Sequence, residues 1–286
     1  MKKLLFQFDT DPYPSVFDTV VAYDGGADHV TGYSNVTPQN VGFLVDGTIF
    51  TRAPKEKKYT AIFIGGSNME AGQILLKAVK KKFFANFRVS VMLDSNGSNT
   101  TAAAGVAMLT RSGSVAGKRA VVLAGTGPVG LRAAALLAKE GAQVVVTSRK
   151  RDRAENACKQ IQERFAVNVS PLEAADNAAR GAALKGTQIV FAAGAAGVQL
   201  LEESHWQNNP SIELMADANA TPPLGIAGVD MMDKAANRNG KTVYGAIGFG
   251  GLKLQVHRAC IGKLFESENQ VFDAEEIYAI AKSMAQ

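Results

Sequence analysis

A strand, a glycine-rich turn, a helix and a second strand follow one another between residues 120 and 150. The turn reads Gly-Thr-Gly-Pro-Val-Gly, with glycines at 125, 127 and 130. In a dinucleotide-binding unit the first glycine allows the tight turn, the second lets a pyrophosphate approach the backbone, and the third lets the helix pack close to the sheet. An apolar strand precedes this turn and a helix over Leu131–Lys139 follows it. The pattern predicts a parallel sheet that binds a dinucleotide; the alternative is a tight turn without a ligand.

The whole turn is expected to contact the cofactor. Pro128 falls in the first helical turn, where its missing N–H costs nothing, and the helix N-terminus presents free N–H groups to phosphates. The predicted contacts here are Gly125, Thr126, Gly127, Pro128, Val129 and Gly130.

The end of the second strand indicates which dinucleotide binds. An NAD site places an acidic residue there, on the ribose 2′-hydroxyl, whereas this strand ends in Ser148, Arg149 and Lys150, with Arg153 soon after. Hydroxyl, guanidinium and ammonium groups suit a 2′-phosphate. The sequence favours NADP, with NAD as second choice; a solvated basic helix start is the structural alternative.

Composition is that of an ordinary globular protein. The 286 residues are 47% hydrophobic and 20% charged, with a net charge of +5. No apolar run is long enough to span a bilayer, and the N-terminus resembles a first strand more than a signal peptide. The two cysteines form no metal or disulfide pattern. We therefore expect a cytoplasmic protein. Basic clusters at 55–58, 77–82 and 149–153 lack interleaved aromatic residues, which disfavours nucleic acid. We expect a small polyanionic ligand and no membrane partner, with 77–82 as an exposed helix end.

Alternating strands and helices predict an α/β fold with two domains. We expect a Rossmann-type NADP domain over residues 102–265 and a second α/β domain over 1–101 completed by a C-terminal helix from 266–286, with the active site in the interdomain cleft. The predicted strands are 3–8, 60–64, 88–93, 119–124, 143–147, 167–169, 188–192, 212–215 and 242–244. The predicted helices include 69–83, capped by Asn68, 101–110, 253–265 and 274–285, with 245–251 as a glycine-rich loop.

Few residues could transfer protons. The histidines, His29, His205 and His257, do not sit at metal-ligand spacing, so no metal site is expected. Oxidation of an alcohol needs a proton acceptor, whereas a carbon flanked by two nitrogens gives up hydride without one. Catalysis of the second kind reduces to holding donor and acceptor carbons about 3–3.5 Å apart.

Several longer stretches closely resemble the methylene-tetrahydromethanopterin dehydrogenases of methylotrophic bacteria, nearly from end to end. The stretches are Phe-Gln-Phe-Asp-Thr-Asp at 6–11, Tyr-Asp-Gly-Gly-Ala-Asp-His at 23–29, Met-Leu-Asp-Ser-Asn-Gly-Ser-Asn-Thr-Thr-Ala-Ala-Ala at 92–104, Asn-Ala-Thr-Pro-Pro-Leu-Gly at 219–225 and Gly-Gly-Leu-Lys-Leu at 250–254. The resemblance implies an enzyme of one-carbon metabolism and formaldehyde oxidation that passes hydride from the methylene carbon of methylene-tetrahydromethanopterin to NADP, giving the methenyl form. It also implies that methylene-tetrahydrofolate is a further substrate in some members, and that the protein is a homo-oligomer.

The resemblance suggests roles for individual residues. The two predicted catalytic residues are Lys253 and Asp94. Lys253 is expected to face the pterin or the reacting carbon, or else to be solvated, and Asp94 is expected to stabilise the methenyl cation, or else to form a turn. Asn99 is expected to be a pterin ligand, and the alternative is that Asn99 or Ser98 is only a helix cap. The predicted substrate contacts are Asp24, His29, Asn96, Asn99, Thr100, Thr101 and His257. Because strand ends line the crevice of such sheets, Gly194 and Asn219 are predicted to contact the nicotinamide half.

Two rival functions remain at this point. One is an NADP-dependent alcohol dehydrogenase of the shikimate dehydrogenase type, which needs a proton-transferring residue such as Lys253. The other is a non-catalytic NADP sensor, against which the long polar loops at 9–29 and 94–101 argue, since a sensor needs no second binding site.

Overall fold

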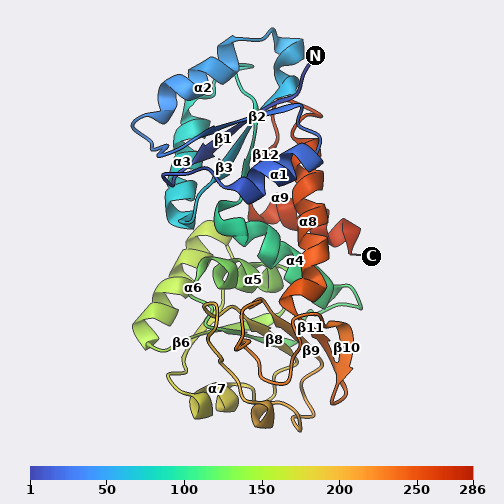
Figure 1. The fold of residues 1–286 in the computed structure, drawn as a ribbon. Helices are drawn as coiled ribbons and strands as arrows, with labels where there is room; N and C mark the ends of the chain where they lie inside the picture. The colour runs from blue at the N-terminus through green and yellow to red at the C-terminus, as the bar shows by residue number, and fades with distance from the viewer. Residues whose placement is uncertain (286) are drawn as a thin grey trace. The chain divides into compact units, whose positions relative to one another are not determined.

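The computed structural model describes residues 1–285, which form two compact units (Figure 1). The first unit comprises residues 1–100 and 254–280; the second comprises 101–253 and the residues described from 281 onward. Helices α4 (Ser98–Thr110), α8 (Ala246–Lys263) and α9 (Ala274–Met284) each pass from one unit to the other. Residues 254–265 therefore belong with the first unit, whereas the sequence prediction put them in the second.

The first unit contains a five-stranded sheet that is parallel throughout. Its order is β12 (Val271–Phe272), β4 (Ser90–Leu93), β3 (Thr60–Gly65), β1 (Leu4–Asp9) and β2 (His29–Tyr33). The chain order reverses direction between β1 and β3, and parallel sheets bind ligands beyond the carboxyl ends of the strands at such a point. This sheet is accompanied by α1 (Val16–Asp24), α2 (Val41–Phe50), a 3₁₀ segment, η1 (Pro54–Tyr59), and α3 (Met69–Lys82).

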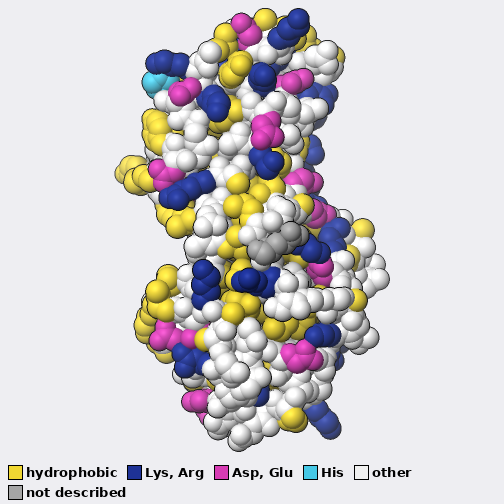
Figure 2. Space-filling model, turned by 90° about the vertical axis from the view of Figure 1, so that its right-hand side faces the viewer, with side chains coloured by type: hydrophobic (Ala, Val, Ile, Leu, Met, Phe, Trp, Pro, Cys, Tyr) yellow, Lys and Arg dark blue, Asp and Glu magenta, His cyan; other side chains and the backbone are white. Residues whose placement is uncertain are grey.

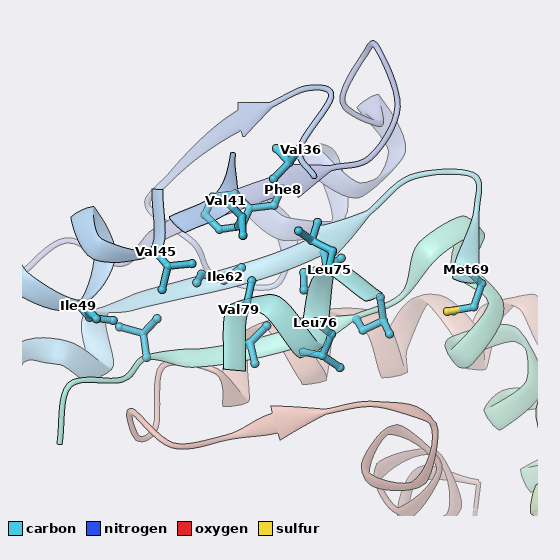
Figure 3. Packing of buried hydrophobic residues seen from close by; sticks show 14 residues of the cluster. Phe8, Val36, Val41, Val45, Ile49, Ile62, Met69, Leu75, Leu76 and Val79 are labelled. Carbon is cyan, nitrogen blue, oxygen red and sulfur yellow. The ribbon is translucent and has the colours of Figure 1, made fainter. Parts of the chain in front are cut away.

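Helices α2 and α3 bury their apolar side chains against this sheet. Val41, Val45 and Ile49 recur every four residues on α2 and are at most 1% exposed, and Leu75 and Val79 do the same on α3. Figure 3 shows these side chains meeting Phe8 and Ile62 of the strands. Each buried side chain of this size contributes about 1.5–3 kcal/mol relative to an exposed one.

The second unit contains a seven-stranded sheet with the Rossmann strand order. Its first strand, β5, lies between β6 and β8, and the sequence of strands across the sheet is β7, β6, β5, β8, β9, β11 and β10. Only the edge pair of β10 and β11 is antiparallel. The strands are β5 (Arg119–Leu123), β6 (Gln143–Ser148), β7 (Ser170–Glu173), β8 (Ile189–Ala192), β9 (Leu214–Asp217), β10 (Lys234–Arg238) and β11 (Lys241–Tyr244). The helices of this unit are α5 (Pro128–Lys139), α6 (Arg151–Phe165) and α7 (Asn177–Ala183). Two short 3₁₀ segments complete the described elements: η2 (Ser95–Gly97) precedes α4, and η3 (Glu203–His205) follows β8.

The predicted α/β class with a Rossmann-type sheet is confirmed, and so is the cap by Asn68, whose side chain accepts a hydrogen bond from the Ala71 amide. Three local predictions were wrong or incomplete. The strand expected at 167–169 lies at Ser170–Glu173; α1, β2 and α2 form within residues for which no element was predicted; and 245–251 is almost wholly helical, because α8 begins at Ala246.

The early start of α8 has a steric reason. A Cβ at Gly248 would lie 1.7 Å from the Asp233 carbonyl oxygen, and one at Gly245 would lie 2.1 Å from that of Asp230. These glycines let the start of the helix pack directly on the backbone at 230–233. Gly245 and Gly248 therefore indicate close packing of a helix, not a loop. No helix among residues 1–285 is long and apolar enough to cross a membrane.

Candidate functional site

The glycine turn between β5 and α5 has the geometry that a dinucleotide phosphate needs. A Cβ at Gly130 would lie 2.6–2.9 Å from backbone atoms of Gly125, and one at Gly125 would lie 2.9 Å from Val146. At Gly127, by contrast, an added Cβ would meet nothing within 4 Å. Gly125 and Gly130 are therefore required by packing, whereas Gly127 leaves space beside the backbone.

The start of α5 is available for an anion. Gly127 is the N-cap residue and provides no side-chain cap, and Pro128 occupies the first helical position as predicted. The uncapped N–H groups and the helix dipole favour a phosphate here. Thr126 and Val129 are part of the same turn, and both are half-buried.

Exposed basic side chains follow β6, the strand next to β5. Ser148 is the last residue of β6 and is 8% exposed, while Arg149, Lys150 and Arg153 are exposed. In the part of the chain that the structure describes, none of these three cations forms an ion pair. Their neighbour Arg151 does, with Glu155. Three uncompensated cations beside a serine hydroxyl form a site suited to a phosphate.

Beyond β8 and β9 lie the two remaining predicted cofactor residues. Gly194 follows β8, and a Cβ at this position would lie 3.0 Å from Cδ1 of Leu200, so the glycine makes room for the leucine side chain. Asn219 follows β9 and is used in building its loop, because its side chain accepts from the Thr221 amide and donates to the Pro223 carbonyl. The bond between Pro222 and Pro223 is cis.

A buried carboxylate holds the same loop. Asp217 ends β9, is 0% exposed, and accepts hydrogen bonds from the Asn219 and Ile226 amides at 3.0 and 2.8 Å. Burial raises the pKa of Asp217 to about 6, although the amides of Asn219, Ile226 and Gly225 act in the opposite direction.

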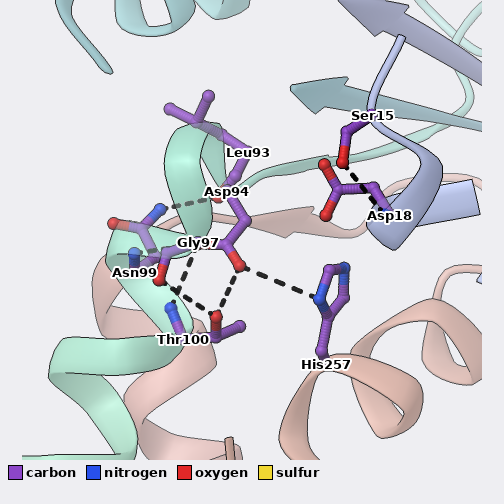
Figure 4. A network of polar contacts seen from close by, with 8 residues as sticks. All are labelled: Ser15, Asp18, Leu93, Asp94, Gly97, Asn99, Thr100 and His257. Atoms are coloured by element: carbon purple, nitrogen blue, oxygen red, sulfur yellow. Dashed lines mark hydrogen bonds and ion pairs between the residues drawn. The ribbon is translucent and has the colours of Figure 1, made fainter. Parts of the chain in front are cut away.

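In the first unit, polar side chains gather at the carboxyl end of β4 (Figure 4). Asp94 directly follows this strand and is 0% exposed. Its Oδ1 accepts from the Asn99 and Thr100 amides at 2.8 and 3.1 Å, and its Oδ2 accepts from the Thr100 hydroxyl at 2.6 Å. The carboxylate thus satisfies N–H groups at the start of α4, which would otherwise lack partners.

Asn99 is neither an exposed ligand nor a side-chain cap. It is 0% exposed, and its Nδ2 donates to the Leu93 carbonyl at 2.6 Å and to Asp273 at 2.9 Å. Thr100 is buried too, with its hydroxyl on Asp94. Both side chains are thus used in building the site, and their contact with a pterin stays a prediction. Asn96, with a positive φ of 55°, is exposed, and Thr101 is half-buried.

His257 of α8 faces this carboxylate. Its Nδ1 lies 4.0 Å from Oδ2 of Asp94, and its ring stacks on Phe63 at 5.4 Å between centroids. The half-exposed ring of Phe17, in the first turn of α1, lies 6.3 Å away. His257 is 1% exposed, so its ring is shielded from solvent. Lys253 lies one turn earlier on α8 and is half-buried; it stands within a helix, not just after a loop.

Two predicted substrate residues lie elsewhere. His29 is the first residue of β2 and pairs in register with Leu4, at the amino end of the sheet, where it contacts Lys2. Asp24 ends α1 and forms an ion pair with Arg258 at 2.7 Å. Asp94 stands beyond the carboxyl ends of the same strands, roughly 15 Å away for five residues of strand. Asp24 and His29 therefore do not join the Asp94 cluster, and neither lies in a glycine-rich loop.

The structure adds residues that sequence reasoning missed. Asp273, at the carboxyl end of β12, accepts from Asn99 and from Gln73. Ser67, after β3, donates to Asp11, after β1, which places polar groups at the switch point of the sheet. The rule that ligands bind at strand carboxyl ends could have found Ser67 and Asp11; Asp273 follows a two-residue strand with no sequence signal.

Each of the two units matches a known protein family over most of its length. Residues 16–96 match the family model described as methylene-tetrahydromethanopterin dehydrogenase, N-terminal, and residues 118–243 match that of the short chain dehydrogenases. A solved structure of 5-ketofructose reductase from a Gluconobacter strain is similar with a TM-score of 0.56, covering 99% of each chain. At 17% identity this likeness concerns the fold alone.

Two curated relatives come from Methylorubrum extorquens. The NAD(P)-dependent methylenetetrahydromethanopterin dehydrogenase is 32% identical, covering 95% of each chain. The bifunctional protein MdtA is 64% identical, covering 99% of each chain. With the matching N-terminal model, these relatives show that the chain belongs to the methylene-tetrahydromethanopterin dehydrogenase family.

Proposed function

We propose that this chain is an NADP-dependent dehydrogenase that transfers hydride from the methylene carbon of methylene-tetrahydromethanopterin to the nicotinamide, giving the methenyl form. The observation that carries the proposal is the 64% identity to the bifunctional protein MdtA along nearly the whole of both chains. The word bifunctional in that name supports a second activity, and we propose methylene-tetrahydrofolate as its substrate, as the family resemblance implies. NAD is the alternative cofactor, since the second relative is named as NAD(P)-dependent.

The residues of the second unit fit the cofactor. The space at Gly127 and the uncapped start of α5 suit the pyrophosphate, and Arg149, Lys150 and Arg153 with Ser148 suit the 2′-phosphate. Gly194, and the loop that Asn219 holds, stand where the crevice rule puts the nicotinamide half. When bound, the nicotinamide supplies the hydride acceptor.

The first unit supplies the pterin site, at the carboxyl end of its sheet. We assign Asp94 the electrostatic role: it is buried, carries a negative charge when ionised, and would favour a cationic product near it. His257 on α8 orients the pterin, and Asn96 offers an exposed polar group. Lys253 and Thr101, which the second unit contains, stay predicted pterin contacts. Phe17, half-exposed against His257, gives an apolar face for a ring.

No proton acceptor is required for this reaction. The two nitrogens beside the methylene carbon stabilise the cation that remains after hydride leaves, so the chain's residues have to position the carbon and exclude water. An alcohol dehydrogenase would instead need a titrating base. We further propose that the protein acts in the cytoplasm as a homo-oligomer, as the family resemblance implies.

Turnover with two pterins and two nicotinamides tests the proposal. Purified protein with methylene-tetrahydromethanopterin and NADP should form NADPH, and the rate of the chemical step should show no essential base across neutral pH. Absence of NADPH formation overturns the activity. A bell-shaped pH profile of the chemical step would instead favour the alcohol dehydrogenase.

Arg149→Ala tests the cofactor assignment separately. It should raise KM for NADP by about tenfold or more, the effect of losing one charge-assisted contact of about 1.5–3 kcal/mol, and leave KM for NAD nearly unchanged. Lys185→Ala, which removes an exposed cation elsewhere on the same unit, is the matched control. Equal effects on both nicotinamides would show that Arg149 does not contact the 2′-phosphate.

A further inference from the structure

The positive charge of the chain is concentrated in one segment of the first unit. Residues 50–88 contain nine lysines and arginines and two acidic residues, a net charge of +7, whereas the whole chain carries +5. Lys55, Lys80 and Lys81 are exposed, and Lys58 is half-exposed. None of these four lysines forms an ion pair within residues 1–285. Lys82, paired with Asp46, is not part of this set.

Three phenylalanines that lie outside the basic runs 55–58 and 77–82 stand exposed beside these lysines. Phe84 and Phe87 flank a tight turn in which Ala85 has a φ of 42°, and their rings stack at 5.0 Å between centroids. Phe50, the last residue of α2, contacts both rings at 6.2 and 5.4 Å. Phe50, Phe84 and Phe87 are 57%, 51% and 37% exposed. We call these three residues the aromatic cluster.

The aromatic cluster and the lysines lie at one edge of the sheet. Phe84 follows the basic last turn of α3, and η1, which carries Lys55 and Lys58, leads directly into the first residue of β3. Both positions belong to the amino end of the sheet, opposite Asp94. Figure 2 shows one face of the first unit, in the upper part of the view, on which hydrophobic, basic and acidic side chains are interspersed. A partner bound to this edge leaves the carboxyl end accessible to substrate.

We propose that the aromatic cluster and its lysines form a docking surface for an anionic lipid bilayer. Exposed aromatic rings on a turn can enter the headgroup region, while lysines around them are attracted to acidic headgroups, each contributing roughly a fivefold gain in partitioning. The binding is peripheral and reversible, so it needs no spanning helix. It revises the expectation of no membrane partner, which considered only spanning segments.

The details of the surface favour lipid over other anionic partners. Protein interfaces are enriched in arginine and depleted of lysine, but here the two arginines donate to backbone carbonyls, Arg52 to Tyr59 and Arg88 to Ala85, and lysines face solvent. Nucleic acid needs free ring faces for base stacking. Phe87 has one face against Phe84 and lies 3.8 Å from Nζ of the buried Lys57.

Vesicle co-sedimentation of the full-length protein tests the proposal. Vesicles of phosphatidylcholine with 30% phosphatidylglycerol should bind the protein at low salt, and pure phosphatidylcholine vesicles should bind much less. The double variant Lys80→Glu/Lys81→Glu should lower partitioning roughly 30-fold or more, and Phe84→Ala should lower it severalfold even at low salt. Dehydrogenase activity in solution should not change in either variant.

Two control variants test whether vesicle binding depends on this surface in particular. Lys185→Glu/Lys234→Glu makes the same charge change on exposed lysines of the second unit, and Phe43→Ala removes a phenylalanine that is 70% exposed. Both should bind vesicles like the unchanged protein. The proposal is overturned if the unchanged protein does not sediment with anionic vesicles, or if the control variants lose binding as much as the test variants.

Discussion

Gly127 and Gly130 belong to one turn and serve different purposes. At Gly130 an added Cβ would lie 2.6 Å from the Gly125 backbone, so Gly130→Ala must displace α5 and should lower the free energy of unfolding by about 1–3 kcal/mol. At Gly127 a Cβ has space, so Gly127→Ala should change stability by less than about 0.5 kcal/mol. The same substitution occupies the space assigned to the pyrophosphate and should raise KM for NADP at least about tenfold, or about 1.4 kcal/mol.

Denaturant unfolding and steady-state kinetics on the two variants separate packing from binding. If Gly127→Ala kept an unchanged KM for NADP, the phosphate would not lie beside this glycine. A stable Gly130→Ala variant would show that α5 can shift away from the turn.

Asp217 is a titrating group within the fold. Its pKa, raised by burial to about 6, exceeds the unfolded value of 3.8, so between these pH values the folded state binds more protons than the unfolded state. Stability from this group is therefore present below pH 4 and is lost as the pH rises through 6, by about 3 kcal/mol in total.

The difference in unfolding free energy between the unchanged protein and Asp217→Asn measures this effect, because other titrations cancel. The unchanged protein should lose stability relative to the variant between pH 4 and 7. A carboxyl carbon resonance of Asp217 that titrates near pH 4 would contradict the prediction, as would a difference that does not vary with pH.

Among the elements, α8 shows that the same residue type can indicate opposite structures. Its glycines predicted a loop, but Gly248 lies against the Asp233 backbone, whereas Gly250 has no atom within 4 Å of an added Cβ. Gly248→Ala should therefore destabilise the fold by more than about 2 kcal/mol. Gly250→Ala should stabilise it by about 0.5–1 kcal/mol through helix propensity. Thermal unfolding of both variants tests this, and destabilisation by Gly250→Ala would mean that the helix start is strained.

The elements that sequence predicted are those with strong local signals. Apolar runs such as 120–123 gave the buried parallel strands, and Asn68 gave the start of α3. Helix α2 has no strong local helix signal, because Gly42, Gly47 and several β-branched residues lower its helix propensity. The helix is stabilised instead by the burial of one of its faces against the sheet.

The candidate site was predictable where chemistry follows local pattern, as in the glycine turn and its basic strand end. It was not predictable where pairing of distant segments decides position. His29 and Asp94 both looked like polar loop residues, but strand register puts them at opposite ends of one sheet. Asn99 looked like a ligand, but a partner 174 residues away in the chain, Asp273, uses its amide.

At the scale of the whole molecule, cofactor binding should appear as stability. A ligand that binds only the folded protein stabilises it by about 2.7 kcal/mol at 100 times its Kd. For a chain of this size that corresponds to a rise in Tm of roughly 4–5 °C. Because the three cations after β6 form no ion pair among residues 1–285, NADP should produce this shift at lower concentration than NAD. Thermal unfolding across a concentration series of each nicotinamide measures it, with Arg149→Ala bringing the NADP curve close to that of NAD. Identical curves for both nicotinamides in the unchanged protein would show that the basic strand end does not select the phosphorylated cofactor.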